Sequence, residues 1–307
     1  MKHKFLGQVL PISCLLLASC GGDSGDSAAS TPTPTSTPTP SPAPTATTYT
    51  PASDFTRDRT FTAAGFRISI DRSAGAAAPE VRIDPEGATI GFDFAVATRT
   101  YTARYLGDSI TAATKATGDP SYDQFEGADS NFSRAPLQVG GSFSVASVGS
   151  TYVGYAKWND HNDTRATGRQ LLFGARTLSS DLPASGAPTF SGLSDISGPG
   201  GGGGGNTAIT VDFTTRTIKG TTEFTPSSTG GTGSSTRPPP APETISFTGT
   251  LDPATGRVSG TATHVLTGAT GKFEGALYGP AASEAAILLV IVRTDNEYYR
   301  GVAAGRR

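Results

Sequence analysis

The chain has 307 residues, of which 16% are charged, and its formal net charge is −2. A charge balance this close to neutral argues against a nucleic-acid-binding protein, which would carry a basic patch. The length predicts one or two domains, and the 39 glycines and 22 prolines are partly gathered in tracts, so that the rest of the chain can still form a core.

The first 20 residues have the pattern of a targeting segment and are not expected to belong to the fold. Lys2 and Lys4 give it a charged start, and an apolar run from Phe5 to Leu17 follows. It ends in Leu17-Ala-Ser-Cys20, which resembles the lipobox of bacterial lipoproteins and implies acyl chains on Cys20. Two or more acyl chains are needed for stable membrane anchoring. An ordinary secretory signal is the alternative interpretation.

Residues 21–51 are predicted to be a linker, because Thr and Pro alternate in TPTPTSTPTPSPAPT and such a run cannot bury a core. Chain of this composition extends in a polyproline-like form, at about 3.1 Å per residue. The linker is either a stiff spacer that holds the folded part away from the lipid or a disordered tether of no particular length.

Residues 52–149 are expected to form a β-rich subdomain. Its predicted strands are Gly65–Ile70, Glu80–Ile83, Thr89–Phe94 and Tyr101–Tyr105. The strand pattern fades from Gly107 to Gly140, which is predicted to be a long polar loop. Long loops in compact domains are usually functional or disordered, and aromatic and Arg side chains dominate interface energetics. The candidate partner-binding residues are therefore Tyr122, Phe125, Phe132 and Arg134. The alternative is that the aromatic side chains pin the loop to its own domain.

Residues 150–307 carry strands at regular intervals and are predicted to form an antiparallel β-barrel of about eight strands. The predicted strands are Thr151–Trp158, Gln170–Thr177, Ala187–Ser194, Ala208–Phe213, Thr217–Phe224, Thr244–Leu251, Arg257–Thr263, Lys272–Tyr278, Glu284–Val292 and Tyr298–Ala304. Glycines recur on their apolar side, as in a small closed barrel. Gly198–Gly205 and Pro226–Pro242 are predicted to be mobile hairpin connections.

Residues Gly271–Val292 are the most informative stretch of this barrel. Phe273, Gly275 and Leu277 share one face of a strand and are predicted to point into the interior. Gly279-Pro280 then interrupts pairing, because Pro has no N–H to donate to a ladder. Glu284–Val292 is apolar almost throughout. It is predicted to be buried on both faces, or to have its outer face covered by another part of the chain.

Phe273-Glu-Gly-Ala-Leu-Tyr-Gly-Pro280 and the following Ala-Ala-Ser-Glu284 resemble the barrel signature of transferrin-binding-protein-B-like surface lipoproteins. The resemblance covers the C-terminal barrel as architecture and is specific over Lys272–Glu284. It implies a smaller handle subdomain before the barrel, a position that residues 52–149 occupy. Two features depart from the family: Glu284 is followed by Ala285-Ala-Ile287 instead of glycines, and the chain is expected to hold one lobe.

Catalytic and metal-binding patterns are not found in the sequence. A Ser–His–Asp triad would need His161 or His264, and His264 has no acid near it in the sequence. Asn159–Asp163 groups potential metal ligands without the spacing of a calcium loop, and an Asn/Asp turn is the simpler interpretation. Loss of Cys14 with the signal and acylation of Cys20 would leave no thiol for a disulfide. No catalytic residue, metal or cofactor is predicted.

The resemblance implies an outer-membrane lipoprotein, anchored through Cys20 and exposed at the cell surface, that binds another molecule for uptake. The implied ligand is a host protein, an iron- or haem-carrying protein or another solute, and an outer-membrane transporter is an implied partner. The alternative is a structural or adhesive envelope lipoprotein without an import role. Neither interpretation involves nucleic acid or catalysis.

Overall fold

The computed structural model describes residues 49–52, 56–71, 79–98, 100–115, 122–127, 136–140, 150–161, 165–199, 201–226 and 241–307. The targeting segment with Cys20, most of the predicted linker, and the candidate residues Phe132 and Arg134 lie outside these ranges. Within the described ranges, no helix has the length and apolar character needed to cross a membrane.

Strands make up most of the described part of the chain. In chain order they are β1 Arg59–Asp71, β2 Glu80–Ala95, β3 Thr100–Tyr105, β4 Asp108–Lys115, β5 Tyr122–Gly127, β6 Pro136–Gly140, β7 Val153–His161, β8 Arg165–Gly174, β9 Thr189–Gly198, β10 Gly201–Asp212, β11 Thr217–Phe224, β12 Glu243–Asp252, β13 Arg257–His264, β14 Thr270–Tyr278, β15 Glu284–Val292 and β16 Tyr298–Arg306. The short 3-10 turns η2 Ser179–Asp181 and η3 Pro280–Ala282 lie between strands.

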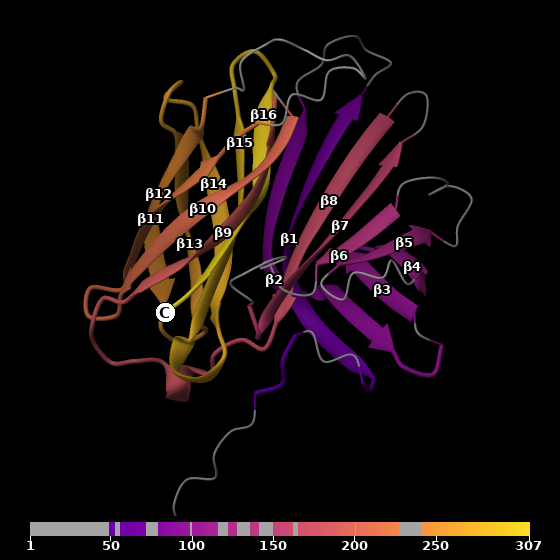
Figure 1. Ribbon diagram of the computed structural model, residues 1–307, viewed down its shortest axis with the longest axis horizontal. Helices are drawn as coiled ribbons and strands as arrows, with labels where there is room; N and C mark the ends of the chain where they lie inside the picture. The colour runs from indigo at the N-terminus through magenta and orange to yellow at the C-terminus, as the bar shows by residue number, and fades with distance from the viewer. Residues whose placement is uncertain are drawn as a thin grey trace, which may run out of the picture. The chain divides into compact units, whose positions relative to one another are not determined.

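The strands form two closed antiparallel barrels of eight strands each (Figure 1). In the first barrel β1 to β8 pair in chain order, and β8 closes the sheet by pairing with β1. In the second barrel β9 pairs with both β10 and β16, so β9 to β16 close in the same way. This confirms the predicted all-β class with a C-terminal antiparallel barrel of eight strands.

The boundary expected between residues 149 and 150 does not match the strand pairing. β7 and β8 pair with each other and β8 pairs with β1, so both strands belong to the first barrel. The second barrel begins only at Thr189. The segment Gly107–Gly140, expected to be a loop, contains β4, β5 and β6. Even spacing reveals strands, but it does not show which sheet they join.

The interior of the second barrel is filled by its own side chains. Phe273 and Leu277 are fully buried in this core, as the sequence predicts. The Phe273 ring fits because two neighbouring strands have glycine beside it: a Cβ on Gly249 would lie 2.8 Å from Phe273 Cζ, and one on Gly260 would lie 2.8 Å from Phe273 Cε1. Such distances are too short for carbon atoms, so these glycines make room for the aromatic ring.

The glycine run after residue 200 is a strand and not the predicted hairpin connection. Gly201–Gly205 opens β10 and pairs with β9 from Gly198 back to Ser194. A Cβ on Gly205 would collide with the carbonyl of Glu223, so the close approach of a neighbouring backbone requires glycine there. The second predicted connection, Pro226–Pro242, falls mainly outside the described residues.

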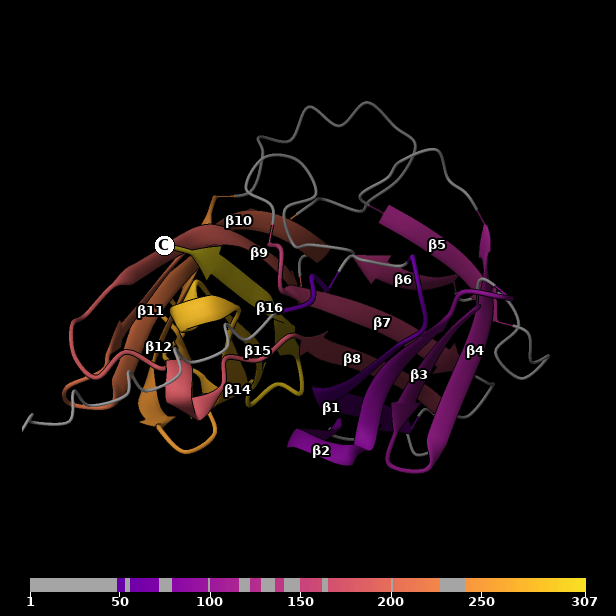
Figure 2. The same cartoon turned by 90° about the horizontal axis from the view of Figure 1, so that it is seen from below.

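The two barrels pack against each other through their outer faces (Figure 2). The shared apolar cluster joins Phe66, Ile68 and Leu172 of the first barrel to Leu288 and Val290 on β15. The alternate residues of β15, among them Ile287 and Leu289, point into the core of the second barrel. Strand β15 is therefore buried on both faces because the first barrel covers its outer side, which confirms the prediction for Glu284–Val292.

Candidate functional site

The inner face of the first barrel is apolar toward one end of the strands and polar toward the other. Phe61, Phe92 and Phe173 belong to the apolar core. Along β1 the side chains alternate, so Arg67 and Ser69 lie on the same inner face as Phe61. The intervening Phe66 and Ile68 face the second barrel instead. The polar half of the inner face is the strongest candidate for a functional site in the described chain.

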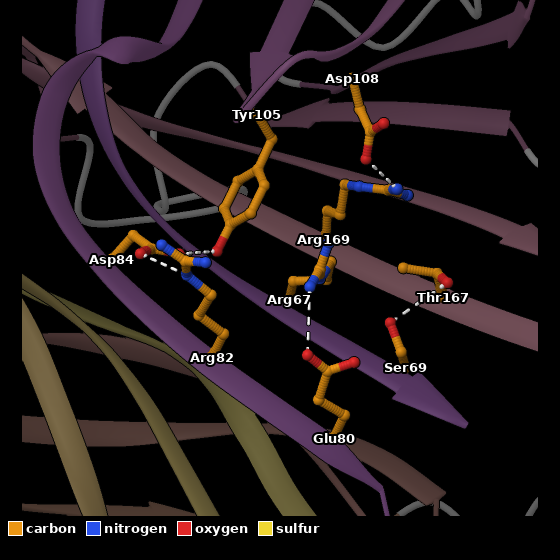
Figure 3. Close-up of polar contacts among 9 residues, drawn as sticks. All are labelled: Arg67, Ser69, Glu80, Arg82, Asp84, Tyr105, Asp108, Thr167 and Arg169. Atoms are coloured by element: carbon orange, nitrogen blue, oxygen red, sulfur yellow. Dashed lines mark hydrogen bonds and ion pairs between the residues drawn. The ribbon is translucent and has the colours of Figure 1, made fainter. Parts of the chain in front are cut away.

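Three arginines form a row across this polar half. Arg67 on β1 lies directly opposite Arg82 on β2 and directly opposite Arg169 on β8. We call Arg82, Arg67 and Arg169 the arginine row. The next row toward the strand ends places Glu80, Ser69 and Thr167 opposite one another. Figure 3 shows both sets of side chains on the same side of the sheet.

Each arginine of the row has a carboxylate partner (Figure 3). Arg67 Nη2 lies 3.3 Å from Glu80 Oε1, and Arg82 Nε lies 2.6 Å from Asp84 Oδ1. Arg169 pairs with Asp108 at the start of β4. The site is thus assembled from four strands and has as many acidic as basic groups in these pairs.

Tyr105 separates the polar half from the apolar half. Its ring is fully buried in the core of the barrel, and its hydroxyl donates a hydrogen bond to Asp84 Oδ2 at 2.5 Å. Burial of the phenol, followed by this bond to a carboxylate, raises the pKa of Tyr105 above its ordinary value. The phenol therefore stays protonated at neutral pH and acts as a fixed donor.

A second polar feature joins the two barrels. The Glu284 carboxylate accepts backbone hydrogen bonds from Thr151 at 2.5 Å and from Tyr152 at 2.9 Å. Glu284 is 3% exposed, and burial raises its pKa although these backbone donors favour the charged form. Thr177 Oγ1 donates to the Gly279 carbonyl at 2.8 Å in the same region. The stretch that resembles the family signature therefore forms the joint between the barrels.

The predicted partner-binding residues are only partly described. Tyr122 and Phe125 lie on β5, whose backbone pairs with β4 and β6, and not in a polar loop as expected. Phe132 and Arg134 lie outside the described residues. The strands form here through ladder hydrogen bonds along short polar segments, which give no clear apolar alternation in the sequence.

His264 was expected to have no acid near it, but the fold places the distant Glu243 beside it. His264 Nε2 lies 2.8 Å from Glu243 Oε2, and Nδ1 lies 2.8 Å from Thr267 Oγ1. The imidazole is fully buried and stacks on the Tyr299 ring, with the two ring centroids 4.4 Å apart. Glu243 reaches it across the β12–β13 pair, where Ile245 lies opposite His264. These contacts are those of a histidine that is packed into the core at one end of the second barrel.

The Asn159–Asp163 segment is also not the predicted turn throughout, because Asn159, Asp160 and His161 end strand β7. Asp163 lies outside the described residues. Among the residues that the structure describes, no group of three or more His, Cys, Asp or Glu side chains is placed to hold a metal ion.

The arginine row was not predicted from the sequence. Its signal was present in β1, where Arg67 and Ser69 alternate with Phe66 and Ile68. This alternation places Phe66 and Ile68 on one face of the strand and Arg67 and Ser69 on the other, without showing which face points into the barrel. The structure shows that the apolar face is the outer one, covered by the second barrel, while the polar residues point inward. Only the pairing of two barrels reveals that inversion.

The chain is similar to solved structures of known proteins, but its sequence matches no known family. No protein-family model and no curated protein matches the chain. Transferrin binding protein B from Neisseria meningitidis is 15% identical, with a TM-score of 0.48, over 80% of this chain and 43% of its own. The chain thus spans less than half the length of that protein. Transferrin binding protein B is a member of the family whose barrel signature Lys272–Glu284 resembles.

The haemoglobin receptor HpuA from Kingella denitrificans is 12% identical, with a TM-score of 0.41, over 82% of this chain and 86% of its own. The same receptor in complex with human haemoglobin gives 13% identity and a TM-score of 0.40. At these identities and TM-scores the likeness concerns the fold alone.

Proposed function

We propose that the chain is a lipid-anchored surface protein of the outer membrane that binds a host protein, an iron- or haem-carrying protein or another solute for uptake. The proposal rests on the lipobox-like Leu17–Cys20 and on the family resemblance of Lys272–Glu284. The structural observation that supports the proposal is that the linker joins the folded part at one end of the strands.

The linker ends in specific contacts beside the joint between the barrels. The Tyr49 hydroxyl donates to Asp181 Oδ2 at 2.7 Å and accepts a hydrogen bond from the Leu178 N–H at 3.0 Å. The Ala52 N–H donates to the Thr151 carbonyl at 2.8 Å. Thr151 also contacts Glu284, so the chain enters the body at one end of the strands.

The opposite ends of both barrels lie away from this entry point, and we propose that they are the presented ends. In the first barrel, β7 starts near this joint and ends at His161, opposite Ala166, so that Thr167 and the arginine row lie toward the presented end. In the second barrel, the presented end includes the β13–β14 hairpin, where Val265 is 58% and Leu266 82% exposed.

The proposed partner-binding residues are Tyr122 and Phe125 on β5 of the first barrel, together with Phe132 and Arg134, which lie outside the described residues. Aromatic and Arg side chains provide large contact areas and directional hydrogen bonds, and they are the common anchors of protein interfaces. The core of the second barrel is filled by its own side chains. A partner of that barrel would therefore bind to its outer surface or to its loops.

The test is capture of a ligand by the full chain, purified in a non-ionic detergent and immobilised. Transferrin and haemoglobin are the first probes, followed by whole plasma with identification of retained proteins. The proposal predicts saturable retention of a defined protein. Retention of none would favour the structural or adhesive envelope protein.

A pair of double variants locates the binding surface. Tyr122→Ala with Phe125→Ala should weaken capture at least about tenfold, as for hot-spot residues. Val265→Ser with Leu266→Ser, which changes the exposed hairpin of the second barrel, should leave capture unchanged. The reverse result would place the binding surface on the second barrel.

A further inference from the structure

The arginine row places like charges where a sheet ordinarily avoids them. Residues directly opposite on neighbouring strands have Cβ atoms about 4.5–5.5 Å apart, and like charges at such positions are destabilising. Arg67 has an arginine opposite it on both sides, Arg82 and Arg169. This arrangement concentrates positive charge at one level of the barrel interior.

The carboxylates that pair with Arg67 and Arg169 are more exposed to solvent than the arginines themselves. The Glu80 side chain is 62% exposed, compared with 22% for Arg67. The Asp108 side chain is 46% exposed, compared with 6% for Arg169. Ion pairs between solvent-exposed groups contribute little to stability. Glu80 can therefore move away from Arg67 at small cost, whereas the buried Arg169 needs another anion beside it when Asp108 moves away.

We propose that the arginine row is an oxyanion-binding site, which takes a sulfate or phosphate group in place of the Glu80 and Asp108 carboxylates. This function goes beyond the proposed capture of a partner protein. Guanidinium groups bind such oxyanions through paired hydrogen bonds in a fixed fork geometry. Arg67 and Arg169, directly opposite each other, are the central donors.

A doubly charged group suits the site better than a carboxylate. A carboxylate ligand would only repeat the contact that Glu80 already makes with Arg67. A sulfate or phosphate has enough oxygens and charge to accept hydrogen bonds from Arg67 and Arg169 together, and it replaces two carboxylates at once.

Two hydroxyl groups lie in the next row and can complete the site. Ser69 and Thr167 are 4% and 5% exposed, and their hydroxyl oxygens are 3.4 Å apart. A bond of this length between two hydroxyl groups is weak. Because a hydroxyl hydrogen rotates freely, either group can turn to donate to a bound oxyanion.

The experiment is calorimetric titration of the full chain, in a non-ionic detergent, with inorganic sulfate and inorganic phosphate at ionic strength matched by chloride. A sulfated disaccharide and a sugar phosphate form separate arms, which distinguish a free ion from a group carried on a sugar. Saturable binding of at least one of these probes is expected. Heats that equal those of chloride for every probe would overturn the proposal.

The sign of the Glu80→Gln effect is the sharpest criterion. Removing a competing carboxylate should tighten binding by about two- to fivefold, because an exposed ion pair no longer has to be broken. Arg67→Gln should weaken binding about tenfold or more, because hydrogen bonds to a charged group are lost. If Glu80→Gln leaves binding unchanged or weakens it, the carboxylate does not compete and the proposal is wrong.

A matched pair on the outer face provides the control. Arg104 Nε lies 2.8 Å from Asp93 Oδ2, with side chains 38% and 30% exposed. Arg104→Gln and Asp93→Asn should leave oxyanion binding unchanged. Equal losses for Arg104→Gln and Arg67→Gln would show general charge attraction and overturn the site. Arg67→Lys keeps the charge without the fork, and it should bind more weakly than the unchanged chain.

Discussion

The Glu284 carboxylate accepts the backbone N–H of Tyr152 at 2.9 Å, across a separation of 132 residues. The bond connects the first residue of β15 in the second barrel to Tyr152, the residue directly before β7 in the first. The Tyr152 ring also makes an edge-on contact with Tyr49, 6.1 Å away between centroids. Glu284 thus links the two barrels at the place where the linker joins them.

Glu284→Ala should destabilise the protein. The change leaves the N–H groups of Thr151 and Tyr152 without their carboxylate acceptor, and a buried unsatisfied donor costs about 1–3 kcal/mol. We expect a loss of about 2–4 kcal/mol in the free energy of unfolding, measured by urea denaturation. Separate transitions for the two barrels would also fit a broken joint.

Glu297→Ala is the control, because its side chain is 48% exposed at a hairpin. Its effect should stay within about 0.5 kcal/mol. If both variants unfold at the same urea concentration as the unchanged chain, the carboxylate does not hold the barrels together.

Phe273→Ala and Lys272→Ala test the register of β14. Phe273 is fully buried among the side chains of the second barrel, and truncating a buried Phe typically costs about 3–5 kcal/mol. Lys272 lies on the opposite face and is exposed, so its loss should matter little. Thermal unfolding distinguishes them, since equal melting temperatures for the two variants would contradict the strand register.

Hydrogen-bonded aspartates in two turns of the second barrel should make the protein less stable in acid. The pKa of Asp252 lies below its ordinary value because its carboxylate accepts hydrogen bonds from the Thr255 hydroxyl and the Ala254 N–H. The pKa of Asp212 is lowered in the same way by the Thr215 N–H. A lowered pKa contributes stability above the ordinary pKa, and this contribution disappears as the pH falls through the folded value.

The unchanged chain should therefore lose more stability between neutral pH and about pH 3 than Asp212→Asn with Asp252→Asn. Urea denaturation across this pH range measures the difference. Thr255→Val removes the strongest donor to Asp252 and should shift the pKa of that carboxyl back toward its ordinary value. Parallel pH profiles for all three proteins would show that these turns do not contribute.

Burial could be predicted from the sequence where the pattern lies within a single strand. Phe273 and Leu277 share a period of two, and β15 is apolar on both faces, so their burial follows directly from the pattern. The partner of a strand does not follow in this way. The pattern shows β7 as a strand, but its pairing with β8 and the closure of β8 on β1 depend on residues far away in the chain.

The candidate site was missed for a related reason. Alternation along β1 separates Arg67 from Phe66, yet it does not say which face points into the barrel. Polar residues are usually outside. Here the second barrel covers the apolar outer face and reverses the usual assignment. The family resemblance covers Lys272–Glu284, but it did not indicate that Glu284 links two barrels.

Cys20→Ser tests the proposed membrane anchor. Without the cysteine thiol no diacylglycerol can be attached, so the protein should move from the membrane fraction to the soluble fraction. Fractionation after a salt wash measures this. A Cys20→Ser protein that remains with the membranes would show that the Leu17–Cys20 segment does not act as a lipobox.

Capture of a host protein by intact cells tests the proposed function most directly. Cells that produce the chain are incubated with labelled plasma proteins, washed, and compared with cells that lack it, before and after protease treatment of the surface. The proposal predicts that producing cells retain a defined protein, that protease removes this retention, and that Tyr122→Ala with Phe125→Ala reduces it. Equal retention by producing and non-producing cells would contradict the proposal.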